Sequence, residues 1–558
     1  MVIYIISMLI CLYIITIFGL GTLQFSKKYY SLNYSNLFEA FFLGFILITS
    51  LTSYASIFFP IRTYSVLIAG ALSVAIHVWL KIQNRMKIHY RIFHKQDIFY
   101  LSVILFFIAF IAADGIKHYD SGLYHVQAIN WIQSYAVLPG LGNLHGRLAF
   151  NSLFFPVSTL LSFNGYLGGK ELLIFPLNAT IVLLFFSNRY FIVKTAISRA
   201  DYPQIIYTLI VTLVGLMYNW NAIGSPTPDI SISIITILTL ESIWSNKTTA
   251  HNLSHYTIIA LVITAIALKL SSIFLTLAII PMLLKHHKSK NILWPYLLRI
   301  TLLTCFILAP FFIRNYYLSG YVVYPFAQLD IFEVDWKIPT SSVIEEQSWV
   351  SSWAKIPGAH FSDILNLNFT SWFPIWLGNQ NPVTWSALIA SFATITICLF
   401  SKNKTHRQLH LGLVILINLI FWLLNAPDPR FAHGLLIFSL GFFLYHISKI
   451  ICTRFTTTQN VLITTFILLL PVVFIVFKIM STSKHYLNTK TEVILPKSMN
   501  LNKNELNMKI IQSTNFQYFV PTIDDRCYNQ DIPCTPYPKS GLILRGSDLS
   551  SGFRISLP

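Results

Sequence analysis

The residues best suited to chemistry lie between Asp114 and Pro156, in the segment DGIKHYDSGLYHVQAINWIQSYAVLPGLGNLHGRLAFNSLFFP. Carboxylates can accept protons, imidazoles can orient those carboxylates or act in their place, and a guanidinium can neutralise an anion. A loop that only joins two apolar spans tolerates almost any polar filler. We therefore interpret this loop as a reaction centre at a membrane surface. Its candidate residues are Asp114, His118, Asp120, Tyr124, His125, His145, Arg147 and Asn151.

Three shorter polar stretches add candidates. Asp229 stands in GSPTPDISI, at the expected start of a helix, where an acid can also serve as an ordinary helix-start residue. Arg314 opens RNYYLSGYVVYPF, which also contains Tyr324; the arginine suits a phosphate but can also extend its charge toward water. The turn NAPDPRFAHG contains Asp428, Arg430 and His433, a set that a purely structural turn does not require.

The composition shows what kind of molecule must position these residues. Of 558 residues, 55% are hydrophobic and only 11% are charged, whereas soluble domains carry roughly 25% charged residues. So large a deficit over so long a chain indicates a polytopic membrane protein. The N-terminal run MVIYIISMLICLYIITIFGLGTL lacks a basic start and a small-residue cleavage site, so we interpret it as a first span rather than a signal peptide.

The expected fold is an all-α polytopic membrane protein with about fourteen transmembrane helices, within a range of about 12–14. The stretch 257–284 contains Lys269 and reads as one long helix or as two. The expected spans are 1–22, 35–58, 65–80, 98–113, 171–187, 203–219, 228–244, 257–270, 271–284, 292–313, 383–400, 408–424, 431–448 and 459–480.

The positive residues orient these spans. Lysines and arginines cluster in short loops at 81–97, 188–202, 285–291, 401–407 and 449–458, which the positive-inside rule assigns to the cytoplasm. Alternation from there predicts extracytoplasmic N- and C-termini in a multi-pass inner (plasma) membrane protein. The polar regions 114–170, 220–229, 313–382 and 425–430 then share the outer face. The distribution in short loops argues against nucleic acid as the reason for the net charge of +18.

The first outer loop, 114–170, has its own expected structure. Apolar residues between Ser121 and Tyr135 recur on one helical face, which predicts an amphipathic helix lying in the membrane interface. A turn at Pro139–Gly142 follows, and Asn143 to Asn151 could begin a second interfacial helix.

Beyond the transmembrane domain 1–480, the tail 481–558 is expected to form a small extracytoplasmic appendage that packs on the outer loops. We interpret its basic residues as a solvated face. Cys527 and Cys534 are the only cysteine pair in a polar region, and a disulfide is expected if this region lies outside the cytoplasm.

The pattern resembles the GT-C superfamily of polytopic glycosyltransferases, which use lipid-phosphate sugar donors; protein O-mannosyltransferases and the aminoarabinose transferase of lipid A are examples. The likeness rests on YDSGLYH at Tyr119–His125, on TPD at Thr227–Asp229 and on PRF at Pro429–Phe431. The string DSGLYH…LPGLGNLHGRLAFNS also resembles an uncharacterised bacterial membrane-protein family that we place in the same superfamily. One departure is that Ser121 follows Asp120, where the superfamily often has paired acids.

The resemblance implies an inverting transfer from a polyprenyl-phosphate sugar to a glycan, lipid or protein acceptor of the cell envelope. Asp120 would be the base, with His118 or His125 orienting or replacing it, and Arg314 and Arg430 would bind the donor phosphate. Asp229 would hold the acceptor or lock an arginine. The remaining implied substrate-binding residues are Tyr124, His145, Arg147, Asn151, Tyr324, Asp428 and His433.

No cofactor is expected, and the lack of paired carboxylates does not support a divalent cation. The expected partners are the lipid-linked donor, the acceptor and membrane lipids, without nucleic acid. Two alternatives remain open. An O-antigen-type polymerase or ligase would use a polyprenyl-diphosphate donor, and a lipid-linked glycan transporter would need charges and broken helices deep in the bilayer, for which Lys269, Arg299 and Glu241 are the candidates.

Overall fold

The computed structural model describes residues 1–26, 30–32, 34–83, 86–88, 94–167, 170–244, 253–284, 290–402, 404–454 and 506–556, with single residues between 469 and 480. The expected span 459–480 lies outside this described part of the chain. Small two-stranded sheets accompany a molecule that is otherwise built of helices.

Within the described residues, ten helices are long and apolar enough to cross a membrane, which confirms an all-α polytopic membrane protein. Glycines let the first two of them approach closely: a Cβ on Gly19 would overlap the Ala40 carbonyl, as small residues often permit between membrane helices. The ten are α1 (Val2–Ser26), α2 (Tyr34–Phe58), α3 (Ser65–Ile82), α4 (Lys95–Ala112), α8 (Leu177–Ser198), α9 (Tyr202–Asn219), α13 (Lys290–Ser319), α17 (Pro382–Phe400), α18 (His406–Asn425) and α19 (His433–Cys452).

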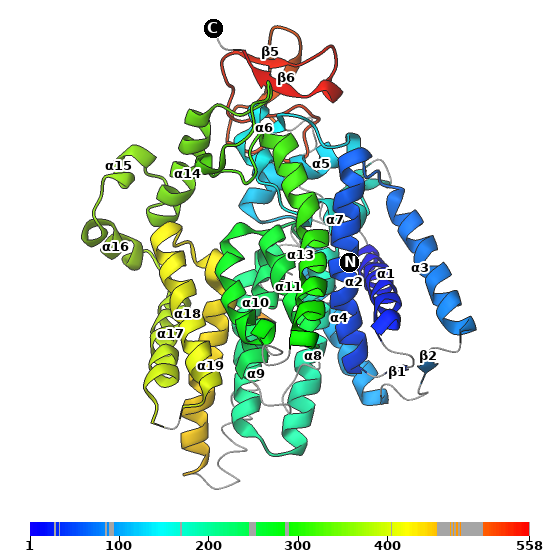
Figure 1. Ribbon diagram of the computed structural model, residues 1–558, viewed down its shortest axis with the longest axis vertical. Helices are drawn as coiled ribbons and strands as arrows, with labels where there is room; N and C mark the ends of the chain where they lie inside the picture. Colours follow the sequence, from blue (N-terminus) through cyan, green and yellow to red (C-terminus); the bar gives the residue numbers. More distant parts are fainter. Residues whose placement is uncertain are drawn as a thin grey trace.

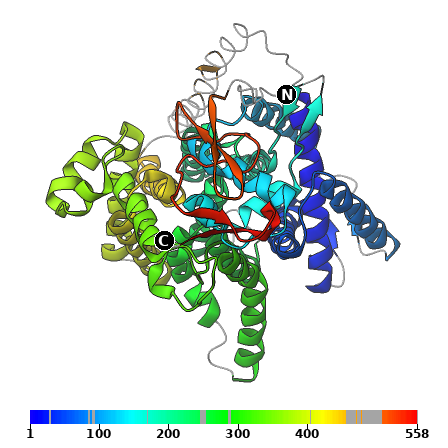
Figure 2. The ribbon, with the colours of Figure 1, turned by 90° about the horizontal axis from the view of Figure 1, so that it is seen from above.

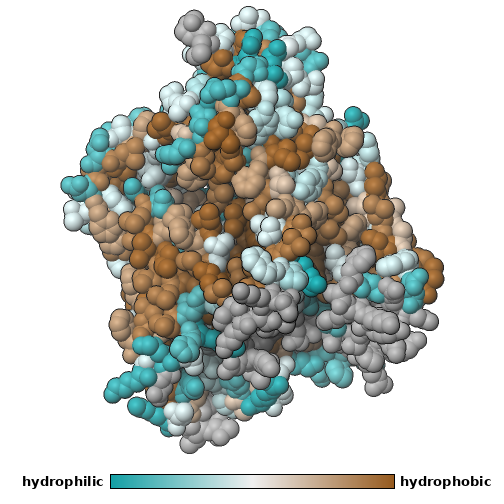
Figure 3. Space-filling view, in the orientation of Figure 1, coloured by the Kyte–Doolittle hydropathy of each residue, from teal (hydrophilic) through white to brown (hydrophobic). Residues whose placement is uncertain are grey.

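The surface has the layering of a membrane protein. Hydrophobic side chains cover the middle height of the molecule, and hydrophilic ones gather toward its upper and lower ends (Figure 3). The long helices stand roughly along the vertical axis, and α5 (Val126–Ser134), α6 (Leu141–Leu144) and the C-terminal strands lie at the upper end (Figure 1).

The predicted span 171–187 is displaced. The chain first forms a hairpin of β3 (Gly165–Leu167) and β4 (Lys170–Leu172), and helix α8 begins only after Pro176. The helix continues past Arg189 because the two guanidinium Nη atoms donate to the two carboxylate oxygens of Glu241, at 2.5 and 2.9 Å. This bidentate pairing explains how two charged residues are accommodated in the helical layer.

The stretch 257–284 is neither one long helix nor two regular ones. Helix α11 (His255–Leu268) ends at Lys269, whose backbone is extended with φ −160° and ψ 122°. A 3-10 helix, η4 (Leu270–Ile279), and the short α12 (Ile280–Leu283) follow. The neighbouring α10 (Asp229–Trp244) begins at the predicted acid and has 16 residues.

Helix α13 runs through Ser319, so Arg314 lies inside the helix and not just past its end as predicted. The outer loop that follows carries η6 (Ala327–Leu329) and three helices, α14 (Thr340–Lys355), α15 (Phe361–Leu365) and α16 (Phe369–Gly378).

The prediction of an amphipathic helix in the membrane interface over 121–135 is wrong. A π-helical turn, η1 (Ser121–His125), leads into α5, whose apolar side chains and the polar Gln127 are buried within the protein. Tertiary packing replaces the lipid surface: the Gln127 amide donates to the Tyr528 and Gln530 carbonyls of the C-terminal segment. The second expected interfacial helix is only the four-residue 3-10 helix η2 (Gly146–Ala149), ahead of α7 (Phe154–Leu160).

The C-terminal segment 506–556 forms a small β-domain, as the prediction of an appendage packed on the outer loops requires. It pairs β5 (Met508–Gln512) with β6 (Gln517–Pro521) and β7 (Leu542–Leu544) with β8 (Phe553–Ile555). The expected disulfide between Cys527 and Cys534 is present. Seen from above, the domain lies across the first outer loop (Figure 2), and the Phe553 and Tyr528 amides donate to the Pro139 and Gly122 carbonyls.

Candidate functional site

A cavity of about 1650 Å³ joins the outer loops to the helices below. Each of the four polar regions assigned to the outer face contributes to its lining, through Asp120, Asp229, Glu346 and Arg430. The C-terminal domain adds Lys539. The predicted convergence of these regions on one side of the molecule is therefore confirmed. The 3-10 helix η4 and the helices α13 and α18 each contribute apolar side chains to its wall.

Asp120 and Arg430 form the centre of the polar end. An Nη1 of Arg430 donates to Asp120 Oδ2 at 3.1 Å, while Nε and Nη2 both donate to Asp428 Oδ2, at 2.9 and 2.8 Å. The turn is preorganised for this arrangement because the Asp428 carboxylate also accepts the Arg430 backbone amide at 2.9 Å. Asp428 thus anchors the arginine from behind, which leaves the Asp120 side facing the cavity.

A second carboxylate stands behind this pair. Asp229 accepts the Lys269 ammonium on Oδ1, and its Oδ2 lies 3.6 Å from His118 Nε2. The same His118 nitrogen is 3.3 Å from Arg430 Nη1, so it lies between Asp229 and Arg430. The Lys269 ammonium also sits 3.9 Å above the centre of the Phe431 ring, a cation–π geometry. Asp229 therefore pairs with a lysine and not with an arginine as proposed from the sequence.

Arg147 extends the charge network toward the outer end of the cavity. Its guanidinium lies 3.9 Å from Asp120 Oδ1 and 3.4 Å from Glu346 Oε1. Both distances exceed that of a good charge-assisted hydrogen bond, about 2.8 Å. Gly146 leaves room for this approach, because a Cβ there would meet the Glu346 carboxylate and the Tyr324 hydroxyl.

The electrostatics favour an ionised Asp120 beside a neutral His125. Burial by itself raises the pKa of a carboxyl, but the charge of Arg430 above all, with that of Arg147, outweighs burial and holds the pKa of Asp120 below its usual 3.8. Burial and the neighbouring His118 lower the pKa of His125 to about 3. His125 stacks on His118 with 5.7 Å between ring centres and approaches the Ser121 hydroxyl with Nδ1 at 3.0 Å. It can shape the site but is poorly suited to collecting a proton.

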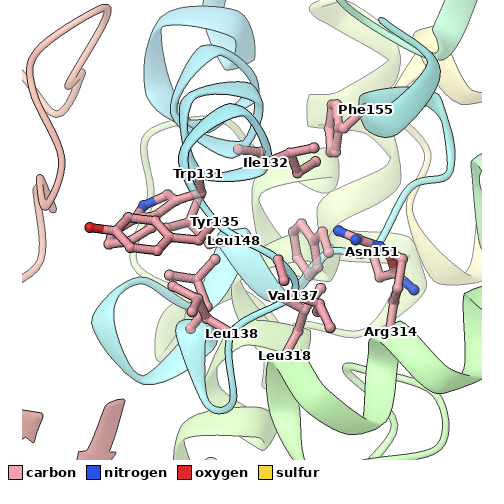
Figure 4. A pocket seen from close by; sticks show the side chains of 14 residues that line it. Trp131, Ile132, Tyr135, Val137, Leu138, Leu148, Asn151, Phe155, Arg314 and Leu318 are labelled. Atoms are coloured by element: carbon pink, nitrogen blue, oxygen red, sulfur yellow. The ribbon is translucent and has the colours of Figure 1, made fainter. Parts of the chain in front are cut away.

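Arg314 is not at this centre. It lines a separate small pocket with Trp131, Leu138 and Leu318 (Figure 4). Its Nε donates to Asn151 Oδ1 at 3.2 Å and its Nη1 to Ser56 Oγ at 2.7 Å. The extension of α13 by one and a half turns explains this placement, because it puts the guanidinium among packed helices. The expectation that Arg314 binds the donor phosphate together with Arg430 therefore does not fit the position of Arg314 in the structure.

The other predicted residues divide into those that reach the cavity and those that do not. His118 and Asp428 support Arg430 without lining the cavity, and Asp114 pairs with Lys117. His433 stacks on Tyr218 with ring centres 4.2 Å apart, outside the lining, because it already belongs to helix α19. The cavity is lined by Asp120, Tyr124, His125, His145, Arg147, Asn151, Asp229, Tyr324 and Arg430.

Lining residues that were missed as members of the site include Lys269, Glu346 and Lys539. A signal for Lys269 exists, since one cation interrupts a long apolar run. Nothing in the local sequence distinguishes Lys539 from the other basic residues of the tail, so the solvated face expected there is wrong for this residue. Among the described residues, no group of three or more His, Cys, Asp and Glu side chains is arranged to hold a metal ion.

Comparisons with known proteins give a family but no activity. No curated protein and no solved structure matches the chain. A family model described as a domain of unknown function, DUF8201, matches residues 1–438. This match covers the cavity-lining residues of all the helices, and it ends before the C-terminal domain. The chain therefore belongs to the DUF8201 family.

Proposed function

We propose that this protein is a membrane glycosyltransferase that moves a sugar from a polyprenyl-phosphate donor to a cell-envelope acceptor at the outer face. One observation carries the proposal: a carboxylate, Asp120, is held between two arginines where a large apolar-walled cavity meets its polar end. This arrangement joins a proton acceptor and cations suited to a phosphate within one cavity that can also take a lipid.

The cavity fits a lipid-linked donor in size and in the distribution of its lining. Pockets for drug-sized ligands measure roughly 300–1,000 Å³, so about 1650 Å³ suits a larger molecule. Ile273, Phe312 and Leu424 line the cavity and are also 45%, 40% and 60% exposed on the molecule's surface. Apolar side chains that are exposed and also line the cavity offer a lipid tail a path from the bilayer into the cavity.

The chemical step is a single displacement. The acceptor hydroxyl oxygen forms a bond to the anomeric carbon while the bond from that carbon to the phosphate oxygen breaks, and polyprenyl phosphate leaves with the electron pair. Asp120 takes the hydroxyl proton. A carboxylate of lowered pKa is a weak base, yet it suffices because the hydroxyl becomes strongly acidic as its new bond forms. Arg430 and Arg147, rather than the predicted Arg314, flank Asp120 and neutralise the leaving phosphate.

Two features support an extracytoplasmic site. The Cys527–Cys534 disulfide lies in the domain that covers the cavity, and disulfides persist mainly in oxidising compartments. The described residues of the loops at 188–202 and 401–407, which carry lysine and arginine clusters, contribute nothing to the cavity lining, in agreement with a cytoplasmic opposite end. A bacterial inner membrane is the setting that this reasoning favours.

The proposal is tested by profiling lipid-linked glycans in a deletion strain and in the same strain carrying Asp120→Asn. Accumulation of a polyprenyl-phosphate monosaccharide in both strains, cleared by the wild-type chain, is the expected result. Accumulation of diphosphate-linked oligosaccharide repeats would instead identify a polymerase. Normal glycans in both strains would remove the transferase proposal altogether.

The pH dependence of transfer distinguishes Asp120 from a histidine base. Because the pKa of Asp120 is held below 3.8, this carboxylate stays ionised as the pH falls toward 3.8. Transfer activity that depends on it should be lost only below that pH. His125, with a pKa of about 3, is neutral over the same range. We expect the transfer rate to vary little between about pH 5 and pH 7. An acid limb within this range would instead point to a base other than Asp120.

Replacing Arg430 or Arg314 by methionine should separate the roles of these two arginines. Arg430→Met is expected to lower the transfer rate by at least about 100-fold, because it removes the cation beside Asp120. Arg314→Met should keep a nearly normal rate, because its guanidinium bonds only the neutral side chains of Asn151 and Ser56 and does not itself line the cavity. Rates are compared at equal amounts of monodisperse protein. A larger loss for Arg314→Met than for Arg430→Met would restore Arg314 to the donor site.

A further inference from the structure

The outer end of the cavity carries polar groups that the proposed chemical step does not use. His145 and Tyr324 line it, are 2% and 3% exposed, and leave His145 Nε2 and the Tyr324 hydroxyl without a hydrogen-bond partner among the described residues. Buried polar atoms without partners are costly. Two of them facing one cavity indicate that a ligand completes their hydrogen bonds.

The C-terminal domain adds a cation to the same region. Lys539 lines the cavity, and its ammonium donates to the Gly142 carbonyl at 3.4 Å. No carboxylate of the described residues forms an ion pair with it. Burial lowers the pKa of Lys539, with the more distant Glu346 and Glu345 acting against this effect. A desolvated ammonium without a close counter-ion would gain from a bound anion.

Glu346 does not fully supply a counter-ion for Lys539. Burial raises the pKa of Glu346 above its usual value, although Arg147 and Lys539 act in the opposite direction. Its Oε1 lies toward Arg147, at 3.4 Å from that guanidinium. His145 is neutral, since burial and the charges of Arg147 and Lys539 keep its pKa well below the usual value. A neutral imidazole can donate to an anion without adding charge.

The domain that carries Lys539 is fixed over the cavity. The hydroxyls of Tyr119, in the first outer loop, and of Tyr537 both donate to the Asp525 carboxylate, and Tyr537 also packs against His145 with ring centres 5.5 Å apart. The domain lies beyond residue 438, where the family match ends. The wall that contains Lys539 is therefore an addition to the part of the chain that the family model describes.

We propose that His145, Tyr324 and Lys539 form an acceptor subsite for a glycan that carries an anionic group, either a carboxylate or a phosphate. This inference rests on the proposed transferase function and names its acceptor class. Lys539 neutralises the anion, and His145 and Tyr324 donate hydrogen bonds to it or to neighbouring hydroxyls. Binding at this outer end brings the acceptor next to Arg147 and Asp120, where its attacking hydroxyl meets the base.

The test expresses the full-length chain in a deletion strain as wild type, Asp120→Asn, Lys539→Gln, Lys539→Arg or Lys509→Gln. Lys509 is the matched control, because it is an exposed lysine of the same domain that does not line the cavity. The acceptor is the glycan that gains one sugar when wild-type chain is re-expressed in the Asp120→Asn strain. It is released from its lipid phosphate by mild acid and then passed over an anion exchanger.

We expect the released acceptor to be retained, and Lys539→Gln to convert it about tenfold more slowly than wild type. Lys539→Arg should recover most of the rate, and Lys509→Gln should match wild type. Loss of retention after phosphatase treatment identifies a phosphate, and loss after chemical reduction of carboxyl groups identifies a carboxylate. Immunoblots and non-reducing gels confirm equal amounts of disulfide-bonded protein.

Two results would overturn the subsite. One is an acceptor that is neutral after release from its lipid, and the other is a Lys539→Gln rate equal to that of Lys509→Gln. Slow conversion by both Lys539→Gln and Lys539→Arg would show a structural role for this lysine and would also reject the proposal. If Asp120→Asn accumulates neither donor nor acceptor, the transferase function itself fails, which is a separate and recognisable outcome.

Discussion

Asp120→Asn is expected to lower the transfer rate by about 10²- to 10⁴-fold, the range that general-base catalysis contributes. The amide keeps the size of the carboxylate but cannot accept the acceptor's proton. Arg430 should stay in place because Asp428 holds it through Nε, Nη2 and the backbone amide. The loss should therefore fall on turnover, measured with purified protein in nanodiscs and the donor recovered from the deletion strain.

The control for this substitution is Asp363→Asn, an exposed acid of α15 that does not line the cavity and should leave the rate unchanged. Asp120→Asn must also unfold at a temperature close to that of the wild type for the comparison to concern chemistry. Near-normal turnover by Asp120→Asn would remove this residue from the reaction and would direct attention to His118, 3.3 Å from the same guanidinium.

Lys269→Met is expected to reduce the free energy of unfolding by about 3–5 kcal/mol, the usual cost of leaving one charge of a buried pair alone. The pair is well protected: the side chain of Asp229 is 8% exposed and that of Lys269 is 24% exposed. Asp229→Asn should cost a similar amount. The double variant Asp229→Asn/Lys269→Met should be markedly more stable than the sum of the two single-variant losses predicts, since it leaves neither charge behind.

The measurement is denaturant unfolding in mixed micelles, with the thermal midpoint as a second readout. Glu333→Gln serves as the comparison, because Glu333 pairs with Lys337 at 3.2 Å while its side chain is 94% exposed. An exposed pair contributes at most about 1 kcal/mol. Additive losses in the double variant would contradict coupling between Asp229 and Lys269.

Much of the helical framework follows from local sequence. Asn381 before Pro382 and Thr405 with Gln408 are helix-start patterns, and helices begin there. Where the expectation failed, a distant partner decided the outcome. The span expected at 171–187 starts late and continues through Arg189, because Glu241 on another helix neutralises that arginine. A hydropathy pattern contains no information about such a partner.

The candidate site was also predicted only in part, because distant partners decide how its charged residues are used. Asp120, Asp229 and Arg430 were found because each is an unusual charged residue beside an apolar span, and positive-charge counting placed them at one end. Arg314 has the same local features, yet it bonds Asn151 and Ser56 and lies outside the cavity lining. Local sequence describes how costly a buried charge is, but the packing of distant helices decides which partner compensates it.

By itself, the sequence determined that this is a helical membrane protein and which segments meet at its polar end, because hydropathy and charge act on each segment separately. Only the tertiary structure decided how Asp114–Pro156 is used. Its helix α5 is buried under the C-terminal domain instead of lying on lipid, because residues about 400 positions later supply its hydrogen-bond partners. The same long-range packing adds Lys539 to the cavity and removes Arg314 from it.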